Sequence, residues 1–182
     1  MADRVYVCGG PGSGKTTFAH ALSARTGLPV EALDEIAREG GGRGPETSAD
    51  ERAQAVQRIL ATQRWIADGV QLGWTQPLVE AADAVVWLDH VAWHASSGRI
   101  VRRFLRQAIA EARSRHGRER FLRFGDYARR LRELIVSVPE TRTYPYEELE
   151  KALAPFAAKV TRCRTADEVA AALAALGGDS AA

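Results

Sequence analysis

The stretch Gly9-Gly10-Pro11-Gly12-Ser13-Gly14-Lys15-Thr16 decides the fold of this chain. A short apolar run, Val5 to Cys8, comes directly before it, and residues at helical spacing follow from Lys15 to Arg25. This order predicts a buried strand, a glycine turn and a helix. The turn fits the pattern GxxxxGK[ST], in which glycines let backbone N–H groups converge on phosphate oxygens at the positive end of a helix. The stretch therefore predicts a phosphate-binding loop.

Each residue type in this loop has an expected role. Lys15 is expected to reach the β- and γ-phosphates of ATP, and the Thr16 hydroxyl to bind Mg²⁺. A glycine turn with a stray lysine is the competing interpretation, and the flanking strand and helix argue against it. The residues expected to bind the nucleotide are Gly10, Pro11, Gly12, Ser13, Gly14, Lys15, Thr16 and Thr17.

Apolar runs alternate with helical patterns along the whole chain. The expected strands are Val5–Cys8, Val30–Leu33, Trp65–Ala67, Ala84–Leu88 and Ala158–Cys163. The expected helices are Lys15–Arg25, one opened by the capping box at Ser48, a short one at Pro77, Ala92–Arg113, Asp126–Val136 and one capped by Thr165. This alternation predicts an α/β fold with a parallel sheet and helices on both faces. We expect one domain over residues 1–178, with a basic helical lid at 99–135 and a frayed tail at 179–182.

Three aspartates follow expected strands. Asp34, Asp68 and Asp89 end the second, third and fourth strands. Ligands of open parallel sheets bind outside the carboxyl ends of the strands, so Asp68 is a candidate for holding Mg²⁺ and Asp34 for accepting a proton from a substrate hydroxyl, with Glu35 as an alternative to Asp34. Each aspartate can instead cap a turn or a helix, and for Asp89 capping is at least as good an interpretation.

Arginines gather in the middle of the chain. Twelve lie between Arg99 and Arg132, and those at 99, 102, 103 and 106 are spaced by three and four, so we expect most of them to project from one side of a helix. Arg99 and Arg103 are candidates for stabilising the charge of a moving phosphoryl group, and a solvated basic face is the alternative. Arg164 follows the last strand, where it can border an adenine ring or belong to a helix cap.

The composition is that of an ordinary globular protein of 182 residues, with 46% apolar residues and a net charge of +2. No apolar run approaches the ~20 residues that a membrane span needs. The N-terminus leads almost directly into the glycine loop, so we expect no signal peptide. We expect a cytoplasmic protein that does not contact membranes, with Cys8 and Cys163 as buried free thiols.

The blocks GGPGSGKTT, LPVEALDE, RWIADGV and ADAVVWLDHVAWHASSGRIVRRFLR resemble the adenylate-kinase-related P-loop proteins, most of all the DNA-topology-modulation-protein-like branch. The resemblance covers most of residues 4–176. It implies a P-loop NTPase three-layer sandwich with five parallel strands in the order 2-3-1-4-5. It also implies phosphate and Mg²⁺ binding by Lys15 and Thr16, and it matches Asp68 to the acidic residue after strand three. By the same resemblance, the helix that contains Arg99–Arg106 is expected to lead into the lid.

The chain departs from adenylate kinases after strand three. Those enzymes follow Asp-Gly with an aromatic, a proline and an arginine that grips a nucleoside monophosphate, whereas Asp68-Gly69 is followed here by Val70-Gln71-Leu72-Gly73-Trp74. AMP is therefore not the expected acceptor. Either Arg38 or Arg43 replaces the missing arginine, or the acceptor carries no phosphate.

We expect a Mg-ATP-dependent kinase that acts on a nucleotide or another small molecule. Lys15 would position the phosphates, Thr16 and Asp68 would organise Mg²⁺, and Asp34 would serve as a base near the acceptor. The alternative is a nucleotide-gated regulatory ATPase that binds nucleic acid or a protein through its arginine-rich face. Steep loss of DNA binding with rising salt would distinguish that alternative.

Overall fold

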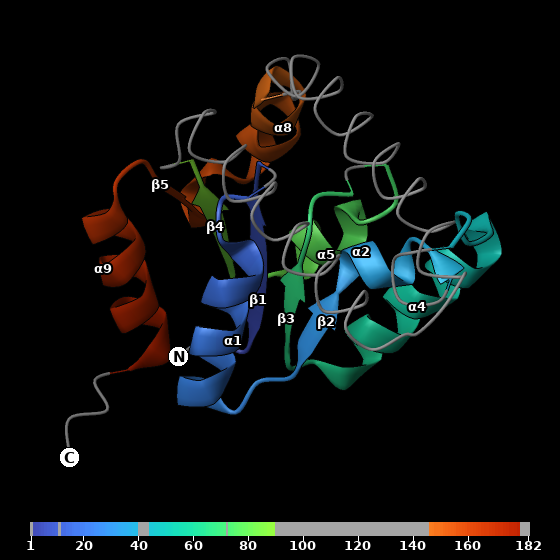
Figure 1. Cartoon of the computed structure of the whole chain (residues 1–182), viewed down its shortest axis with the longest axis horizontal. Coiled ribbons are helices and arrows are strands. Elements are labelled where there is room, and N and C mark those ends of the chain that lie inside the picture. The colour runs from blue at the N-terminus through green and yellow to red at the C-terminus, as the bar shows by residue number, and fades with distance from the viewer. Residues whose placement is uncertain (1, 11, 40–43, 72, 90–145, 179–182) are drawn as a thin grey trace, which may run out of the picture. The chain divides into compact units, whose positions relative to one another are not determined.

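The computed structural model describes residues 2–10, 12–39, 44–71, 73–89 and 146–178 (Figure 1). Its parallel sheet lies in the order β2-β3-β1-β4-β5, which confirms the predicted fold class and strand order. The strands are β1 (Arg4–Gly9), β2 (Val30–Ala32), β3 (Trp65–Asp68), β4 (Ala84–Leu88) and β5 (Val160–Cys163). The expected lid at 99–135, the helices predicted within it and the tail at 179–182 lie outside the described residues.

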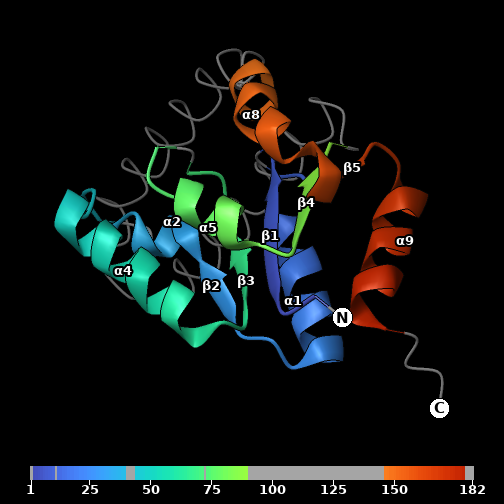
Figure 2. The same ribbon diagram turned by 180° about the vertical axis from the view of Figure 1, so that it is seen from behind.

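Helices cover both faces of the sheet (Figures 1 and 2). Two of them, α1 (Lys15–Thr26) and α9 (Ala166–Gly177), share one apolar cluster with alternate residues of the strands, because successive side chains of a strand point to opposite faces. On the other face, α4 (Ala49–Thr62) and α5 (Gln76–Ala81) contact one another, and α5 contacts β1. The remaining short elements are α2 (Leu33–Ile36), α8 (Tyr146–Leu153) and the 3₁₀ helix η2 (Ala154–Lys159).

Capping boxes fix the starts of two helices, as the sequence predicts. The Ser48 hydroxyl accepts a hydrogen bond from the backbone N–H of Glu51 at 3.2 Å, and the Glu51 carboxylate accepts one from the backbone N–H of Ser48 at 2.8 Å. Thr165 and Glu168 form the same reciprocal pair at the start of α9. Each box satisfies N–H groups that have no partner inside the helix.

Two strand predictions are wrong by one or two residues. The strand expected over Val30–Leu33 stops at Ala32, because Ala32 pairs with Asp68, the last residue of β3, and no partner strand continues beyond it. Leu33 instead begins α2, with its side chain buried. The strand expected from Ala158 begins at Val160, because residues up to Lys159 belong to η2.

Both cysteines are buried and free, as predicted. Burial raises the pKa of the Cys8 thiol to about 12 and also raises the pKa of the Cys163 thiol. Neither side chain is therefore a thiolate at neutral pH. In the described part of the chain, no helix has the length and apolar character needed to cross a bilayer.

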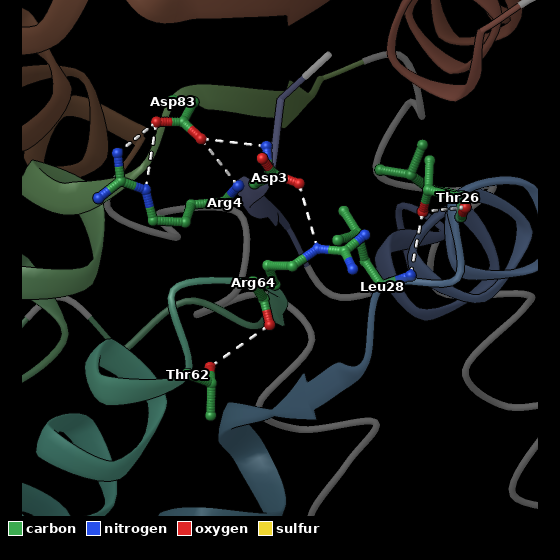
Figure 3. Close-up of polar contacts among 8 residues, drawn as sticks. Asp3, Arg4, Thr26, Leu28, Thr62, Arg64 and Asp83 are labelled. Atoms are coloured by element: carbon green, nitrogen blue, oxygen red, sulfur yellow. Dashed lines mark hydrogen bonds and ion pairs between the residues drawn. The ribbon is translucent and has the colours of Figure 1, made fainter.

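A polar network ties the amino ends of the strands together (Figure 3). The Arg4 guanidinium donates to the Asp83 carboxylate at 2.6 Å, and the backbone N–H groups of Asp3 and Arg4 donate to its other oxygen. Arg64, the residue before β3, donates to the Asp3 carboxylate at 3.2 Å. The hydrogen bond from Arg4 lowers the pKa of the Asp83 carboxyl. This network lies at the edge of the sheet opposite to the glycine loop.

Gly9→Ala is expected to destabilise the fold by roughly 2–4 kcal/mol. Gly9 has a φ of +148°, which residues with a side chain rarely adopt, and a Cβ there would collide with the Leu88 carbonyl and lie 2.9 Å from Ser13 Oγ. Urea unfolding measures the loss. Gly73→Ala is the matched control, since a Cβ at Gly73 meets nothing within 4 Å. Equal stability losses in the two variants would contradict this account of Gly9.

Candidate active site

The strand register brings the candidate residues to the carboxyl edge of the sheet. Val7 of β1 pairs with Asp68 of β3, and Asp68 pairs with Ala32 of β2. The glycine loop begins two residues after Val7, and Asp34 lies two residues after Ala32 in the first turn of α2. Three segments far apart in sequence therefore meet at one edge, as expected for ligand sites in open parallel sheets.

The glycine loop joins β1 to α1 through left-handed backbone. Gly12 and Gly14 have φ values of +72° and +95°, and Gly14 is the N-cap of α1. The backbone N–H of Ser13 donates to the Gly10 carbonyl at 3.2 Å. Thr16 and Thr17 lie exposed in the first turn of the helix, whereas Pro11 is outside the described residues. The predicted strand, loop and helix are confirmed, and each loop residue's part in binding stays a prediction.

The Lys15 side chain folds back over the loop. Its Nζ donates to the carbonyls of Gly9 at 3.0 Å and Gly10 at 3.1 Å. The ammonium is thereby held beside the backbone that would surround a phosphate. When an anion binds, the Lys15 ammonium can donate to its charged oxygens in place of the two neutral carbonyls. Hydrogen bonds to charged acceptors are stronger.

Asp68 is the most buried carboxylate of the described chain, with 6% of its surface exposed. Burial raises the pKa of this carboxyl, while a hydrogen bond from the Thr16 hydroxyl and the charge of Lys15 act in the opposite direction. Its Oδ1 has no hydrogen-bond partner among the described residues, and neither does Ser13 Oγ, which is also buried. Buried polar atoms without partners are rare and call for a ligand or water.

The Asp68 carboxylate and the Thr16 hydroxyl form the candidate cation site. The described residues contain no group of three His, Cys, Asp or Glu side chains arranged for a metal ion. Asp68 and the Thr16 hydroxyl are hard oxygen donors next to a phosphate loop, which suits Mg²⁺, an ion that usually keeps several waters and binds phosphate oxygens. The donor set present therefore fits Mg²⁺ as a companion of a nucleotide.

Asp34 is exposed and has a partner that the sequence did not reveal. Gln71 Nε2 donates to Asp34 Oδ1 at 3.0 Å across 37 positions of sequence. The charge of Asp34 also raises the pKa of Asp68, so the two carboxylates are electrostatic neighbours. The only sequence signal for Gln71 is its place in the segment where an adenylate kinase would carry an arginine.

Other candidates have structural partners or lie outside the described residues. Asp89 accepts from the Arg162 guanidinium at 2.9 Å, and this arginine also stacks on Trp87 and pairs with Glu150. Arg38 donates to the Gly44 carbonyl at 3.4 Å and pairs weakly with Glu46. Arg164 is exposed directly after β5, and its bordering of an adenine ring stays a prediction. The remaining arginine candidates, outside the described residues, are Arg43, Arg99 and Arg103.

Three solved structures that are similar to this chain are named as kinases. A gluconokinase from Sinorhizobium meliloti 1021 matches with a TM-score of 0.50 at 19% identity, over 96% of this chain and 93% of that one. A sugar kinase from Janibacter sp. HTCC2649 matches with a TM-score of 0.38 at 25% identity, over 55% and 66%. A shikimate kinase from Acinetobacter baumannii, in complex with shikimate, matches with a TM-score of 0.42 at 16% identity, over 84% and 94%.

The gluconokinase likeness supports the fold alone, which is the α/β fold of P-loop kinases. No curated protein matches the chain. A family model described as AAA domain matches residues 4–116, which include the glycine loop, Asp34 and Asp68. With more than half of its length matched, the chain belongs to the AAA domain family.

Proposed function

We propose that the protein is a Mg-ATP-dependent phosphotransferase that moves the γ-phosphoryl group to a hydroxyl of a small molecule. The observation that carries this proposal is Asp68, a buried carboxylate with one partnerless oxygen beside a phosphate loop. Such an oxygen is costly in a folded protein unless a ligand completes it. A carboxylate whose pKa is raised by burial, in contact with Thr16 of the loop, marks a functional site.

The loop and α1 would bind the donor. Backbone N–H groups of the glycine loop and the Lys15 ammonium bind the phosphates, and the α1 N-terminus adds its positive dipole. Asp68 and Thr16 would hold Mg²⁺, which neutralises charge on the phosphate oxygens when it is bound. The chain's own contribution is to place these donors before the reaction begins, so that little reorganisation accompanies transfer.

Asp34 would act on the acceptor. Its carboxylate takes the proton of the acceptor hydroxyl while that oxygen bonds to the γ-phosphorus, and the bond between this phosphorus and the β–γ bridging oxygen breaks. ADP leaves with the bond electrons, and Asp34 releases the proton to solvent. Asp34 suits this part because it is exposed at the same edge as the loop, within electrostatic reach of Asp68.

The gluconokinase, whose fold is related, is a kinase by name, and its match spans nearly the whole chain. This likeness supports a kinase without identifying the acceptor. The alternative, a nucleotide-gated regulatory ATPase that binds nucleic acid or a protein through the arginines between Arg99 and Arg132, concerns residues outside the described structure. No observation on the described residues favours it.

A transfer screen tests the proposal. The full chain is incubated with Mg²⁺ and γ-labelled ATP, and acceptors are supplied as nucleotides, sugars and small hydroxylated acids, gluconate among them. We expect label in one acceptor product and ADP in equal amount. Release of inorganic phosphate alone with every acceptor would show an ATPase, and absence of ATP binding in calorimetry would overturn the nucleotide site itself.

Asp68→Asn is expected to stabilise the ligand-free protein by about 1 kcal/mol at pH 7, because it removes a charge that burial disfavours. Burial raises the pKa of Asp68 in the folded protein. The carboxyl group therefore contributes stability that is fully present below its pKa in the unfolded chain and is lost as pH rises through its pKa in the folded protein. The gain in the variant should therefore grow with pH. Urea unfolding between pH 4 and 8 measures it.

Asp83→Asn is the control variant, because its effect on stability should have the opposite sign. The pKa of Asp83 is lowered, so its contribution is present above its unfolded pKa and is lost as pH falls through the folded pKa. This variant should lose stability at pH 7, by less than about 1 kcal/mol because its ion pair with Arg4 is partly exposed. Added Mg-ATP should raise the melting temperature of Asp83→Asn as it does for the wild type, and much less for Asp68→Asn. A destabilised Asp68→Asn protein would contradict the buried-charge account.

A further inference from the structure

Gln71 holds one oxygen of the candidate base. Its amide Nε2 donates to Asp34 Oδ1 at 3.0 Å, and Oδ2 accepts no hydrogen bond from any described residue. An amide that donates through its nitrogen keeps its Oε1 as an acceptor. The pair therefore presents two accepting oxygens, one from each side chain, at the edge of the sheet that carries the phosphate loop.

The backbone of Gln71 is anchored to the core of the sheet. Its carbonyl accepts from Thr75 Oγ1 at 2.8 Å, and from the backbone N–H groups of Trp74 and Thr75 at 3.2 Å each. Thr75 Oγ1 is in turn bonded to the buried Tyr6 hydroxyl of β1 at 3.0 Å. A residue fixed at its own carbonyl by a buried network has fewer ways to move, so its amide can orient a partner.

Glycine at position 69 makes the approach of the two segments feasible. Gly69 has a φ of +149°, and a Cβ there would lie 2.8 Å from the Leu33 Cβ and 3.5 Å from Asp34 Oδ1. The backbone N–H of Gly69 donates to the Val7 carbonyl at 3.1 Å. The turn after β3 is thus pressed against the start of α2, and Gln71 and Asp34 meet there.

Carboxylates lie around this pair, and the charges of two basic residues of α1, Lys15 and His20, act on Asp68. Asp34 and Glu35 are exposed in the first turn of α2, and Asp68 is buried next to them with an unpartnered oxygen. Arg38, the arginine expected as a substitute phosphate grip, instead donates to the Gly44 carbonyl and pairs with Glu46. A phosphorylated acceptor would meet carboxylates here, whereas hydroxyl groups would find acceptors.

We propose that Gln71 is a positioning residue for Asp34, and that the two side chains together select a polyol without a phosphate group. One hydroxyl donates to Asp34 Oδ2 and is the one phosphorylated, while a neighbouring hydroxyl donates to Gln71 Oε1. This inference rests on the proposed phosphotransferase function and adds the acceptor class. Gln71 binds no part of the nucleotide.

Matched pairs of acceptors test the class. Ribose against ribose 5-phosphate, and gluconate against 6-phosphogluconate, are compared with myo-inositol and AMP, by calorimetry with a non-hydrolysable ATP analogue and by transfer from ATP. We expect binding and transfer for at least one unphosphorylated polyol, and at least tenfold weaker binding of its phosphorylated partner. Failure of every polyol to bind, or better binding of a phosphorylated compound, overturns the inference while the ATP site stands. Failure to bind the ATP analogue overturns the proposed function instead.

Variants of Gln71 test its part. Gln71→Leu should raise KM for the accepted polyol and lower kcat, with a loss of about 10- to 100-fold in kcat/KM, and should leave KM for ATP unchanged. Gln76→Leu is the matched control, because Gln76 makes an equivalent 3.0 Å bond to the Glu80 carboxylate, and both of these α5 side chains are exposed. Equal kinetics of the two variants would overturn the role of Gln71.

Gln71→Glu adds a readout that a merely structural residue would not move. The new carboxyl group lies against Asp34, and two adjacent carboxylates hold one proton more tightly than either alone. When protonated, the new group can donate to Asp34 Oδ1 as the amide does. The activity of Gln71→Glu relative to the wild type should therefore recover as pH falls, and a constant ratio across pH 5 to 8 would contradict the proposal.

Discussion

Lys15→Ala is expected to lower phosphoryl transfer by about 10²–10³-fold and to weaken Mg-ATP binding by about 10- to 100-fold, while the protein stays folded. The Lys15 ammonium donates hydrogen bonds to the carbonyls of Gly9 and Gly10, at 3.0 and 3.1 Å. Lys15→Ala removes these two hydrogen bonds, each of which contributes about 1 kcal/mol to stability, so the protein is expected to stay folded. Losing the charge beside the phosphates removes stabilisation that grows in the transition state. Calorimetry and steady-state kinetics measure the two effects separately.

Lys151→Ala provides the control, since Lys151 is an exposed lysine of α8. Lys15→Arg should rescue Lys15→Ala poorly, because a broad planar guanidinium does not replace a compact ammonium inside a tight loop. Unchanged ATP affinity together with unchanged turnover in folded Lys15→Ala would end the proposal that this loop binds a triphosphate.

Asp34→Asn is expected to reduce transfer by about 10²–10⁴-fold with nearly unchanged affinity for Mg-ATP. The asparagine keeps an oxygen that can accept from Gln71 Nε2, so the local structure persists, but it cannot take a proton. The loss then falls on kcat and kcat/KM for the acceptor. Product formation is measured with the acceptor found in the transfer screen, and ATP affinity by calorimetry.

Glu35→Gln removes the adjacent exposed acid of the same helical turn and should leave transfer close to that of the wild type. If Asp34→Asn weakens Mg-ATP binding in proportion to turnover, Asp34 belongs to the metal site and another residue is the base. Robust phosphorylation of AMP by the wild type would contradict the inference from the missing arginine after Gly69.

The fold was predictable because local signals and topology agreed. The glycine loop, the short apolar strands and the capping boxes at Ser48 and Thr165 each identify an element within a few residues, and alternation of strands and helices leads to a parallel sheet. Short elements are not predicted correctly. Leu33-Asp34-Glu35-Ile36 forms only one helical turn, which is too short for a periodic pattern, so the apolar run predicts Leu33 as the last residue of a strand.

The sequence predicts which candidate residues meet at one edge of the sheet, and their roles stay predictions. The glycine loop, Asp68 and Asp34 lie at the carboxyl ends of parallel strands, and those ends share one edge. Side-chain pairs that form only through tertiary contacts could not be predicted from the sequence. Gln71 with Asp34 and Arg162 with Asp89 lie 37 and 73 positions apart in sequence. Their hydrogen bonds depend on turns whose direction no local pattern specifies.

The burial of both thiols makes the native chain suitable for single-site chemical labelling. Cys8 and Cys163 are the only cysteines of the sequence, and a thiol that is buried and protonated reacts slowly with maleimides. A cysteine introduced at exposed Gly73, between Gln71 and Thr75, would carry a fluorophore without first removing the natural ones. The dye would sit on the turn that holds Asp34, where its emission can report acceptor binding in real time.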